Sequence, residues 1–437
     1  MADLKELARR IFHETLAAID IPATMQRKLR REGTRLHCNG NVFDLRNFEK
    51  LRVVTIGKAA HAMVEGLALV LSPFVRFEGV VSAPTAARKP VTGMRYFVAG
   101  HPVPNEESWK AAEAILALLK RCDEKTLAFF LLSGGGSALV ELPLDPRQTL
   151  KDIQQLHRAL VTCGAPIDAI NTIRKHVSAV KGGRLAAAAN GATKITLAVS
   201  DVPEGKESAL ASGPTLPDPT TVADAERLIA EYSLRDKFPQ ASRNWLDQGR
   251  MPETPKTDDP AFRNSYFSLL LGMDDLFHPA HRSAEAEGFI TCCDNSTDDW
   301  PIGKAAENLL GQLDELRKTH PGQRVALIAD GEVSSPVTGN GTGGRNSAFV
   351  LACVEKIAGK KIAVLSAGTD GVDGNSAAAG AVADGETLER ARAAGLDPGE
   401  AFRGSDAFTF FSKLEDAIVT GPTGNNLRDL RILIAEP

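Results

Sequence analysis

The chain has 437 residues, with 51 Lys and Arg against 55 Asp and Glu, so its formal net charge is −4. At about 100–200 residues per domain, this length predicts two or three domains. The near balance of charge argues against a nucleic-acid scaffold or a polybasic membrane binder, because both depend on a basic face. With 43% hydrophobic and 24% charged residues, the composition is typical of a globular chain and too apolar for a disordered one.

The cysteines and the N-terminal residues bear on the cellular compartment in which the protein works. The six cysteines are too few for a disulfide framework in a chain of this length, and they show no CxxC spacing typical of a metal or redox site. The N-terminal segment lacks the apolar stretch of a signal peptide, and no window approaches the about 18 apolar residues of a membrane span. We therefore expect a soluble, cytoplasmic protein with neither nucleic acid nor membrane among its partners.

Strand and helix patterns alternate along the first half of the chain. Apolar residues at helical spacing predict an amphipathic helix over residues 3–20. Short apolar, β-branched runs follow at residues 52–56, 79–82, 94–99, 127–132 and 194–199, and helical segments at 106–120 and 150–163. This alternation predicts a mostly parallel sheet covered by helices on both faces. In such sheets ligands bind beyond the carboxyl ends of the strands, where the glycines of this chain gather.

The pattern changes between residues 239 and 260, where prolines among Asp, Lys and Thr predict an irregular connection. Strand-like runs resume after it at residues 289–293, 325–329, 361–365, 417–419 and 431–434. We place a domain boundary near residue 300, so the predicted domains are residues 1–300 and 301–437.

The most informative motif is the glycine-rich segment Ser133–Ser137, which directly follows an apolar run. Three consecutive glycines let the backbone approach a ligand closely, and a helix beginning near Ser137 would add its positive dipole end. An anion cradle is favoured over a tight turn without a ligand, because a bare turn needs one glycine rather than three. The residue orders of a P-loop and of a nucleophile elbow are both absent, so serine hydrolysis stays a weak alternative.

Other charged residues follow strands in the same way. Lys58 comes after Ile56-Gly57, where it is either a compact charge suited to phosphate or a solvated lysine at a helix start. Asp201 follows the run 195–199, where a carboxylate binds Mg²⁺, takes a hydroxyl proton or caps a turn. His101 lies on a turn after a strand, and we expect it to line the ligand crevice beyond the carboxyl ends of the strands.

A basic stretch lies between these motifs and the second half of the chain. It contains Arg174, Lys181 and Arg184, and we interpret these residues as one solvated side of a helix.

The second half repeats the theme of polar residues after apolar runs. Asp330-Gly331-Glu332 ends one run, and the glycine-rich stretch 339–344 leads into Arg345-Asn346. This predicts a mobile loop, able to act as a hinge or lid, with a bidentate donor for phosphate or carboxylate at its end. The stretch 368–375, which includes Asp370, supplies oxygen ligands that suit magnesium better than zinc.

Anion-binding loops, a lysine, an arginine and scattered carboxylates fit phosphoryl transfer, in which cations and Mg²⁺ neutralise charge that spreads over the transferred group. No nucleophile–base pair is evident from spacing, which suits a kinase whose substrate brings its own hydroxyl. A set of motifs extends this pattern over the chain from about residue 50 to the end: residues 56–60, 100–104, 132–139, 174–176, 181–185, 200–203, 211–215, 343–346, 368–371 and 420–424.

In their types and order, these motifs resemble those of the class II glycerate 2-kinases. The C-terminal third resembles the MOFRL domain of that family. The resemblance implies an α/β protein with two domains, a larger Rossmann-like α/β/α domain and a smaller MOFRL domain, and an active site in the cleft between them. It also implies ATP-dependent phosphorylation of D-glycerate to 2-phosphoglycerate with ATP and Mg²⁺ as cofactors. The implied partners are the small-molecule substrate and the nucleotide, and a homo-oligomer is allowed.

The resemblance also implies roles for single residues. Lys58 and Arg345 would face the transferred phosphoryl group, and Asp201 would lie near the metal or the reacting hydroxyl. Asp201, Glu332 and Asp370 are the expected metal ligands. The expected residues for phosphate or the substrate carboxylate are Ser133, Gly134, Gly135, Gly136, Ser137, Arg174, Lys181 and Asn346. The family commonly has threonine after Glu332, whereas Val333-Ser334 follow here, which removes a hydroxyl at 333 unless Ser334 substitutes for it.

Two rival functions remain. Some members of the family are labelled hydroxypyruvate reductases of tartrate degradation, so an NAD(P)H-dependent reductase is the alternative enzyme. No strand leads into G-x-G-x-x-G with an acidic residue about 20 positions further on, which argues against that reading. A binding protein that senses a sugar phosphate without turnover would keep the anion loops but would have no use for carboxylates near the phosphate.

Overall fold

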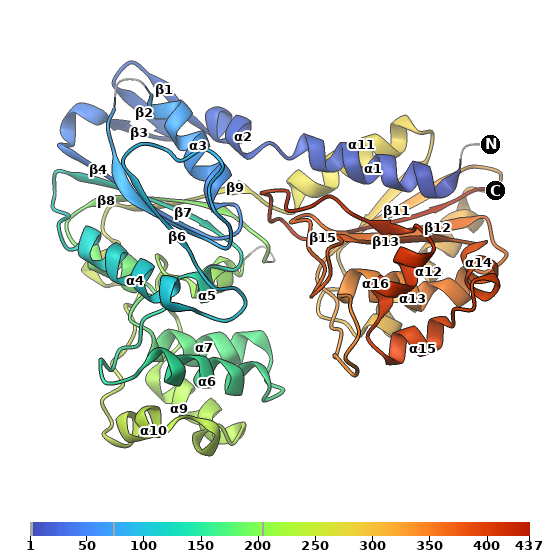
Figure 1. Cartoon of the computed structure of the whole chain (residues 1–437). Helices are drawn as coiled ribbons and strands as arrows, with labels where there is room; N and C mark the ends of the chain where they lie inside the picture. Colours follow the sequence, from blue (N-terminus) through green and yellow to red (C-terminus); the bar gives the residue numbers. More distant parts are fainter. Residues whose placement is uncertain (1–2, 73–74, 203–204) are drawn as a thin grey trace. The chain divides into compact units, whose positions relative to one another are not determined.

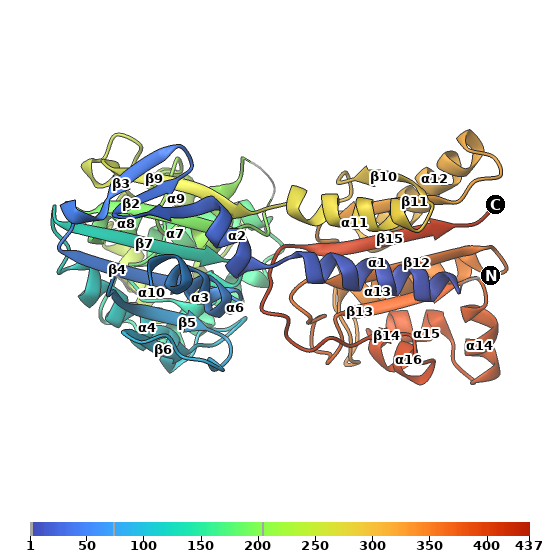
Figure 2. The same ribbon diagram turned by 90° about the horizontal axis from the view of Figure 1, so that it is seen from above.

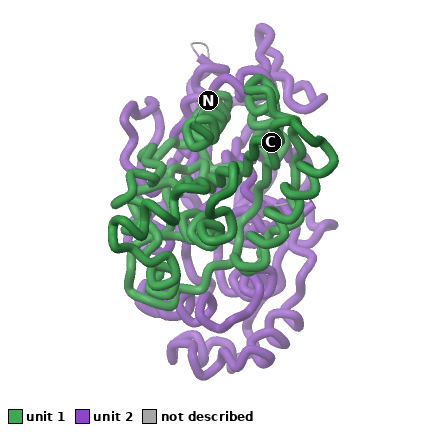
Figure 3. The backbone as a smooth tube through the Cα atoms, turned by 90° about the vertical axis from the view of Figure 1, so that its right-hand side faces the viewer, with its two compact units in different colours: residues 1–20, 272–437 green, residues 21–271 purple. Residues whose placement is uncertain are grey.

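The computed structural model describes residues 3–72, 75–202 and 205–437, and the chain forms two compact units (Figures 1 and 3). The large unit consists of residues 21–271, and the small unit combines residues 1–20 with residues 272–437. This division differs from the expected boundary near residue 300. Residues 272–300 belong with the C-terminal part because they form α11 (Asp274–Ala286) and β10 (Ile290–Asp294), and β10 pairs with the small unit's sheet.

The large unit contains the predicted parallel sheet. Its six strands lie in the order β6-β5-β4-β7-β8-β9, and every pairing is parallel. This result confirms the α/β fold class. The strands are β4 (Lys50–Ile56), β5 (Glu78–Ala83), β6 (Met94–Val98), β7 (Thr126–Ser133), β8 (Thr193–Val199) and β9 (Ser265–Leu271).

Helices cover both faces of this sheet. Ala128 and Phe130 of β7 pack in one core with α4 (Glu106–Leu119) and α8 (Arg184–Ala188), so the alternate residues of β7 face the other side. There α3 (Ala60–Leu71) covers the sheet, as Figure 1 shows. Because all eight residues of β7 are buried, an uninterrupted apolar run was the right signal for a central strand.

Smaller elements complete the large unit. A four-helix group packs around its own core of Leu, Ile, Phe and Trp side chains, and a three-stranded antiparallel sheet follows α2 (Ile21–Lys28). An irregular connection is expected over 239–260, but its first part forms α10. Pro239 directly precedes this helix, a position at which proline does not interrupt helical hydrogen bonds. The group consists of α6 (Leu150–Val161), α7 (Ile167–Val177), α9 (Val222–Glu231) and α10 (Gln240–Asp247), and the small sheet of β1 (Leu29–Glu32), β2 (Arg35–Cys38) and β3 (Asn41–Asp44).

The small unit has a mixed six-stranded sheet in the order β10-β11-β15-β12-β13-β14. Only the β10–β11 pairing is parallel, and the last strand, β15, lies between β11 and β12 and runs antiparallel to both. The bounds are β11 (Val325–Asp330), β12 (Ile362–Gly368), β13 (Gly380–Asp384), β14 (Ala417–Ile418) and β15 (Asp429–Ala435).

Helices also cover both faces of the mixed sheet. The predicted N-terminal helix is α1 (Leu4–Ala18), capped by the Asp3 side chain, and it lies with α11 along one face (Figure 2). The opposite face packs against a second layer made of α12 (Ile302–Thr319), α13 (Arg345–Ile357), α14 (Thr387–Ala393), α15 (Pro398–Arg403) and α16 (Ala407–Lys413). Within the three described ranges, no helix is both long and apolar enough to span a bilayer.

Candidate active site

The carboxyl ends of the large unit's strands bring several of the predicted residues together. Ile56 of β4 pairs with Leu132 of β7, and Ser133 pairs with Val199 of β8, so all three strands end at the same edge. Lys58, the segment Ser133–Ser137 and Asp201 follow these ends directly. The loops after β4 and β7 are in direct contact.

Gly57 and Ser133 hold these two loops against each other. Gly57 has φ +133°, and a Cβ atom there would lie 2.0 Å from Ser133 Oγ, so only glycine fits. The Lys58 N–H donates to the carbonyl of Gly134 at 3.0 Å, and the Ala59 N–H donates to Ser133 Oγ at 3.0 Å. The buried Ser133 hydroxyl therefore joins the loops, a role that the sequence did not predict.

The glycines also create room beside Lys58. Gly135 has φ +84°, and a Cβ there would lie 3.0 Å from the His101 ring and 3.4 Å from Lys58 Cγ. Lys58 and His101 therefore flank the same glycine. The helix expected to begin near Ser137 is α5 (Gly136–Leu139), a single turn, so its dipole contributes less than a long helix would.

A chain of hydrogen bonds supports Ser137 from behind. Its Oγ lies 2.7 Å from Ser212 Oγ, which in turn donates to Asn171 Oδ1 at 3.2 Å. Ser212 is fully buried, and both it and Ala211 have positive φ, which is costly for residues with a Cβ. The motif at 211–215 had no assigned role in the sequence, and its Ser-Gly-Pro composition was the only signal for this turn.

The basic stretch after Asn171 is not one solvated helix face. Helix α7 ends at Val177 and α8 begins at Arg184, so Arg174, Lys181 and Arg184 do not share a helix. Lys181 is 1% exposed, and its Nζ lies 2.6 Å from Glu141 Oε2. The expectation of a solvated face is wrong because Lys181 is paired in the interior with Glu141, a carboxylate that the sequence pattern does not connect to it.

Glu141 is the centre of this buried cluster. It also lies 2.8 Å from His157 Nε2 and accepts a hydrogen bond from Ser178 Oγ at 2.6 Å. Burial alone would raise the pKa of Glu141, but Lys181 and His157 outweigh it and bring the pKa down to about 2. Burial lowers the pKa of Arg174, which faces the same carboxylate. The structure thus places Lys181 in the interior.

The corresponding edge of the small unit is built from three strands. Because β15 is antiparallel to its neighbours, its first residues meet the last residues of β11 and β12: Leu430 pairs with Asp330, and Asp429 pairs with Gly368. Asp429 and Asp370 both approach this point, since a Cβ on Gly368 would lie 3.0 Å from Asp370 Oδ1 and 3.4 Å from Asp429 Oδ1. The sequence did not single out Asp429.

Arg345 opens α13 at this edge and is held by two carboxylates. Its Nη1 donates to Glu332 Oε2 at 2.7 Å, and its Nη2 lies 2.6 Å from Glu332 Oε1. Its Nε and Nη2 face Asp429, the latter at 3.3 Å. Burial alone would lower the pKa of Arg345. The carboxylates of Asp429 and Glu332 outweigh burial, so the pKa lies above its ordinary value. The predicted bidentate donor is therefore present, already paired with carboxylates.

The neighbouring residues fix the start of α13. Asn346 is buried, its N–H donates to Asp373 Oδ1 at 2.9 Å, and its side-chain oxygen accepts from Ser366 Oγ at 2.6 Å. Asn346 thus points into the core of the small unit. The stretch 339–344 is expected to be mobile. In the structure its backbone N–H groups donate to the Gly404 carbonyl and to the side chains of Asp406 and Asn375.

A second arginine, Arg428, joins the strand ends to the loop before α12. It lies 2.5 Å from Asp298 and 3.0 Å from Asp330, and Asp298 accepts the N–H of Glu332 at 2.7 Å. Val333 is buried in the core, and Ser334 is exposed with its N–H bonded to the Trp300 carbonyl. Across the part of the chain that the structure describes, no three His, Cys, Asp or Glu side chains are arranged to hold a metal by themselves.

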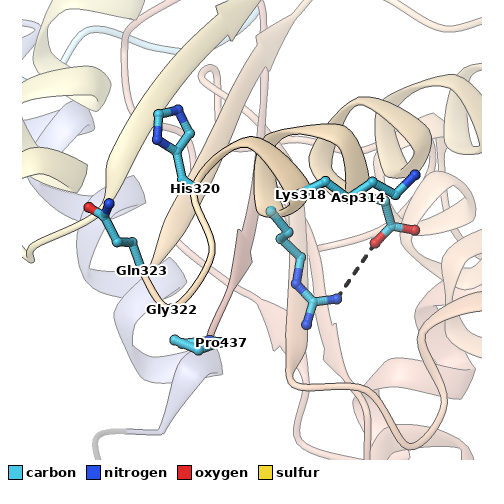
Figure 4. Close-up of a pocket in the computed structure, with 7 residues that line it drawn as sticks. Asp314, Lys318, His320, Gly322, Gln323 and Pro437 are labelled. Carbon is cyan, nitrogen blue, oxygen red and sulfur yellow. Dashed lines mark ion pairs between the residues drawn. The ribbon is translucent and has the colours of Figure 1, made fainter.

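A shallow pocket lies elsewhere in the small unit. It has a volume of about 430 Å³ and lies where α12 ends, with Arg317, Lys318 and His320 on its rim (Figure 4). None of the predicted site residues lines this pocket.

Comparisons with known proteins match two family models to different parts of the chain. Residues 7–247 match the family model described as Domain of unknown function (DUF4147), and residues 325–429 match the MOFRL family. The fold and both strand-end sites thus define a two-unit α/β protein of the DUF4147–MOFRL class. Within that class, the chain belongs to the glycerate kinase family, which confirms the resemblance seen in the sequence.

Individual relatives agree over nearly the full length. The D-glycerate 2-kinase of Thermotoga maritima is 34% identical and covers 88% of this chain and 91% of its own. A putative hydroxypyruvate reductase of Agrobacterium vitis is 37% identical, with 87% and 86% covered. The crystal structure of the Thermotoga maritima glycerate kinase superposes with a TM-score of 0.81 at 32% identity, covering 99% of each chain.

Replacing Glu141 with glutamine should destabilise the large unit, because it leaves the buried Lys181 without its counter-ion. We expect Glu141→Gln to lower the free energy of unfolding by about 3–5 kcal/mol in urea denaturation. Glu226→Gln, at an exposed position of α9, is the matched control and should change it by under about 0.5 kcal/mol. A Glu141→Gln variant as stable as the control would show that the ion pair is not needed.

Asp330 should make the stability of the small unit depend on pH. Burial raises its pKa from 3.8 to about 6, although Arg428 opposes this shift. Because the folded pKa is the higher one, its stabilising contribution is complete below about pH 4 and is lost as the pH rises through 6. The free energy of unfolding of wild type minus that of Asp330→Asn should therefore fall by on the order of 2–3 kcal/mol between pH 4 and pH 7.

Urea denaturation at each pH measures this difference, and Asp258→Asn, at an exposed position, is the control. A difference that stays constant from pH 4 to pH 7 would contradict a raised pKa at Asp330.

Proposed function

We propose that this protein transfers the γ-phosphoryl group of ATP to the 2-hydroxyl of D-glycerate, giving 2-phosphoglycerate and ADP. The observation that carries the proposal is that each unit presents a cation, Lys58 or Arg345, at the carboxyl ends of its strands. In the transfer, the bond from the γ-phosphorus to the bridging oxygen of ADP breaks, and a bond to the glycerate oxygen forms. Phosphoryl transfer depends mainly on positioning and on neutralising charge, which is what fixed cations provide.

In the large unit, the proposed roles follow from the loop contacts. Lys58 beside Gly135 offers a point charge, and the backbone N–H groups of Gly134–Gly136, which carry no side chains of their own, are proposed to approach phosphate oxygens. Asp201 is proposed to accept the proton that leaves the 2-hydroxyl. Ser137, oriented by Ser212, is proposed to donate to the substrate carboxylate or phosphate.

In the small unit, Arg345 is proposed to face the transferred group with its Nη1–Nη2 edge. Asp370 and Glu332 are proposed to hold Mg²⁺ together with nucleotide oxygens and water. The donors fit, because Mg²⁺ is usually bound through one or two carboxylates rather than by an all-protein cage. When bound, the ion neutralises phosphate charge. ATP, Mg²⁺, a cytoplasmic location and a homo-oligomer all remain predictions.

Purified protein with ATP, Mg²⁺ and D-glycerate should release ADP in a coupled assay and yield 2-phosphoglycerate, identified by its phosphorus NMR shift. Lys58→Ala and Arg345→Ala should each lower kcat/KM by about 10²–10³, the range found when one charge-stabilising donor is removed. Lys110→Ala and Arg227→Ala replace exposed, ion-paired cations on α4 and α9 and should retain wild-type turnover.

The rival functions give different outcomes in the same experiment. Oxidation of NADH by hydroxypyruvate without ADP release would overturn the kinase in favour of a reductase. Tight binding of D-glycerate or ATP with neither activity would instead identify a binding protein.

A further inference from the structure

The two edges of the Arg345 guanidinium are held by carboxylates that differ sharply in exposure. Asp429 faces the edge formed by Nε and Nη2, and its side chain is 5% exposed. Glu332 faces the edge formed by Nη1 and Nη2, and its side chain is 41% exposed. Arg345 therefore has one interior counter-ion and one counter-ion that solvent reaches.

Asp429 is fixed by its surroundings. It is the first residue of β15 and pairs with Gly368 of β12, so its backbone belongs to the sheet. Burial alone would raise its pKa, but Arg345, Arg431 and a hydrogen bond from Asn346 outweigh it and lower the pKa. An ionised carboxylate in this position cannot leave Arg345 without leaving an uncompensated buried charge.

Glu332 is held less firmly. It follows β11 in a segment that is neither helix nor strand, and exposed ion pairs contribute little because water competes for both partners. A phosphate or carboxylate oxyanion presents the same pair of oxygens to a guanidinium edge as Glu332 does. Such an oxyanion can take the place of Glu332 while Asp429 stays.

We propose that Glu332 is an exchangeable counter-ion that an incoming oxyanion displaces from Arg345, and that Asp429 is the positioning residue that keeps the guanidinium aimed. Glu332 occupies the solvent-facing edge of Arg345 while no anion is bound, and its release presents the Nη1 and Nη2 donors of that edge to the ligand. This inference rests on the proposed function for the identity of the oxyanion, which is a phosphate of the nucleotide or the carboxylate of D-glycerate.

Isothermal titration calorimetry of the full chain in EDTA tests the exchange, with ATP and D-glycerate as separate probes. Removing the competing charge in Glu332→Gln should tighten binding of one probe about two- to fivefold, the factor that corresponds to one exposed ion pair. Glu315→Gln, which replaces an exposed glutamate paired with Lys318 on α12, is the matched control and should bind like wild type. A gain for ATP identifies phosphate as the displacing oxyanion, and a gain for D-glycerate identifies carboxylate.

Asp429→Asn should weaken binding of the same probe by about tenfold or more, since the guanidinium loses its fixed partner. Thermal unfolding separates this effect from loss of the fold. If Asp429→Asn does not fold, Arg345→Lys is compared with and without Glu332→Gln. Lysine lacks the planar fork of N–H donors that binds two oxygens at once, so the gain from Glu332→Gln should vanish.

Unchanged or weaker binding of both probes by Glu332→Gln, in a protein whose wild type binds them, would overturn the exchange. Failure of the proposed kinase reaction gives a different result from failure of the exchange. Tighter ATP binding in Glu332→Gln without any ADP release from wild type would keep the exchange and reject the proposed reaction. Normal ADP release by the wild type, without tighter binding of either probe in Glu332→Gln, would reject the exchange and keep the proposed reaction.

Discussion

Several buried positive charges in this protein are matched by a carboxylate, and this pairing stabilises them in the interior. Taking a charge out of water costs far more than a single hydrogen bond returns, and a paired carboxylate offsets much of that cost. The interior pairs are Lys181 with Glu141, Lys175 with Asp218, and Arg428 with Asp330. Lys58 and Arg345 differ from them because each lies at a strand end and retains some exposure.

Strand direction is the second constraint on the site. In the large unit, parallel strands send all their carboxyl ends to one edge, so consecutive loops meet without further design. In the small unit, the chain reaches the same arrangement differently, because the antiparallel β15 brings its first residue, Asp429, to the ends of β11 and β12. Both edges therefore gather residues that are far apart in the sequence.

Hydrophobic patterning was sufficient to predict the parallel sheet, and the contact between the loops of Lys58 and Ser133–Ser137 follows from the pairing of β4 with β7. Patterning could not predict the partners of Lys181 or Arg345, because Glu141 and Asp429 are 40 and 84 positions away and are chosen by the tertiary fold. The boundary near residue 300 failed for a related reason. Strand β10 looks like a continuation of the first sheet, and only its pairing with β11 assigns it to the small unit.

In the proposed function, the two strand-end edges hold an anion by opposite means. In the large unit, glycines carry no side chains, so that backbone N–H donors and the compact charge of Lys58 can approach the anion. In the small unit, carboxylates on both edges of Arg345 set the plane of a rigid fork. A lysine at 345 would keep the charge but lose the plane. The residue type at each edge thus follows from its surroundings: open backbone suits a point charge, and paired carboxylates suit a planar one.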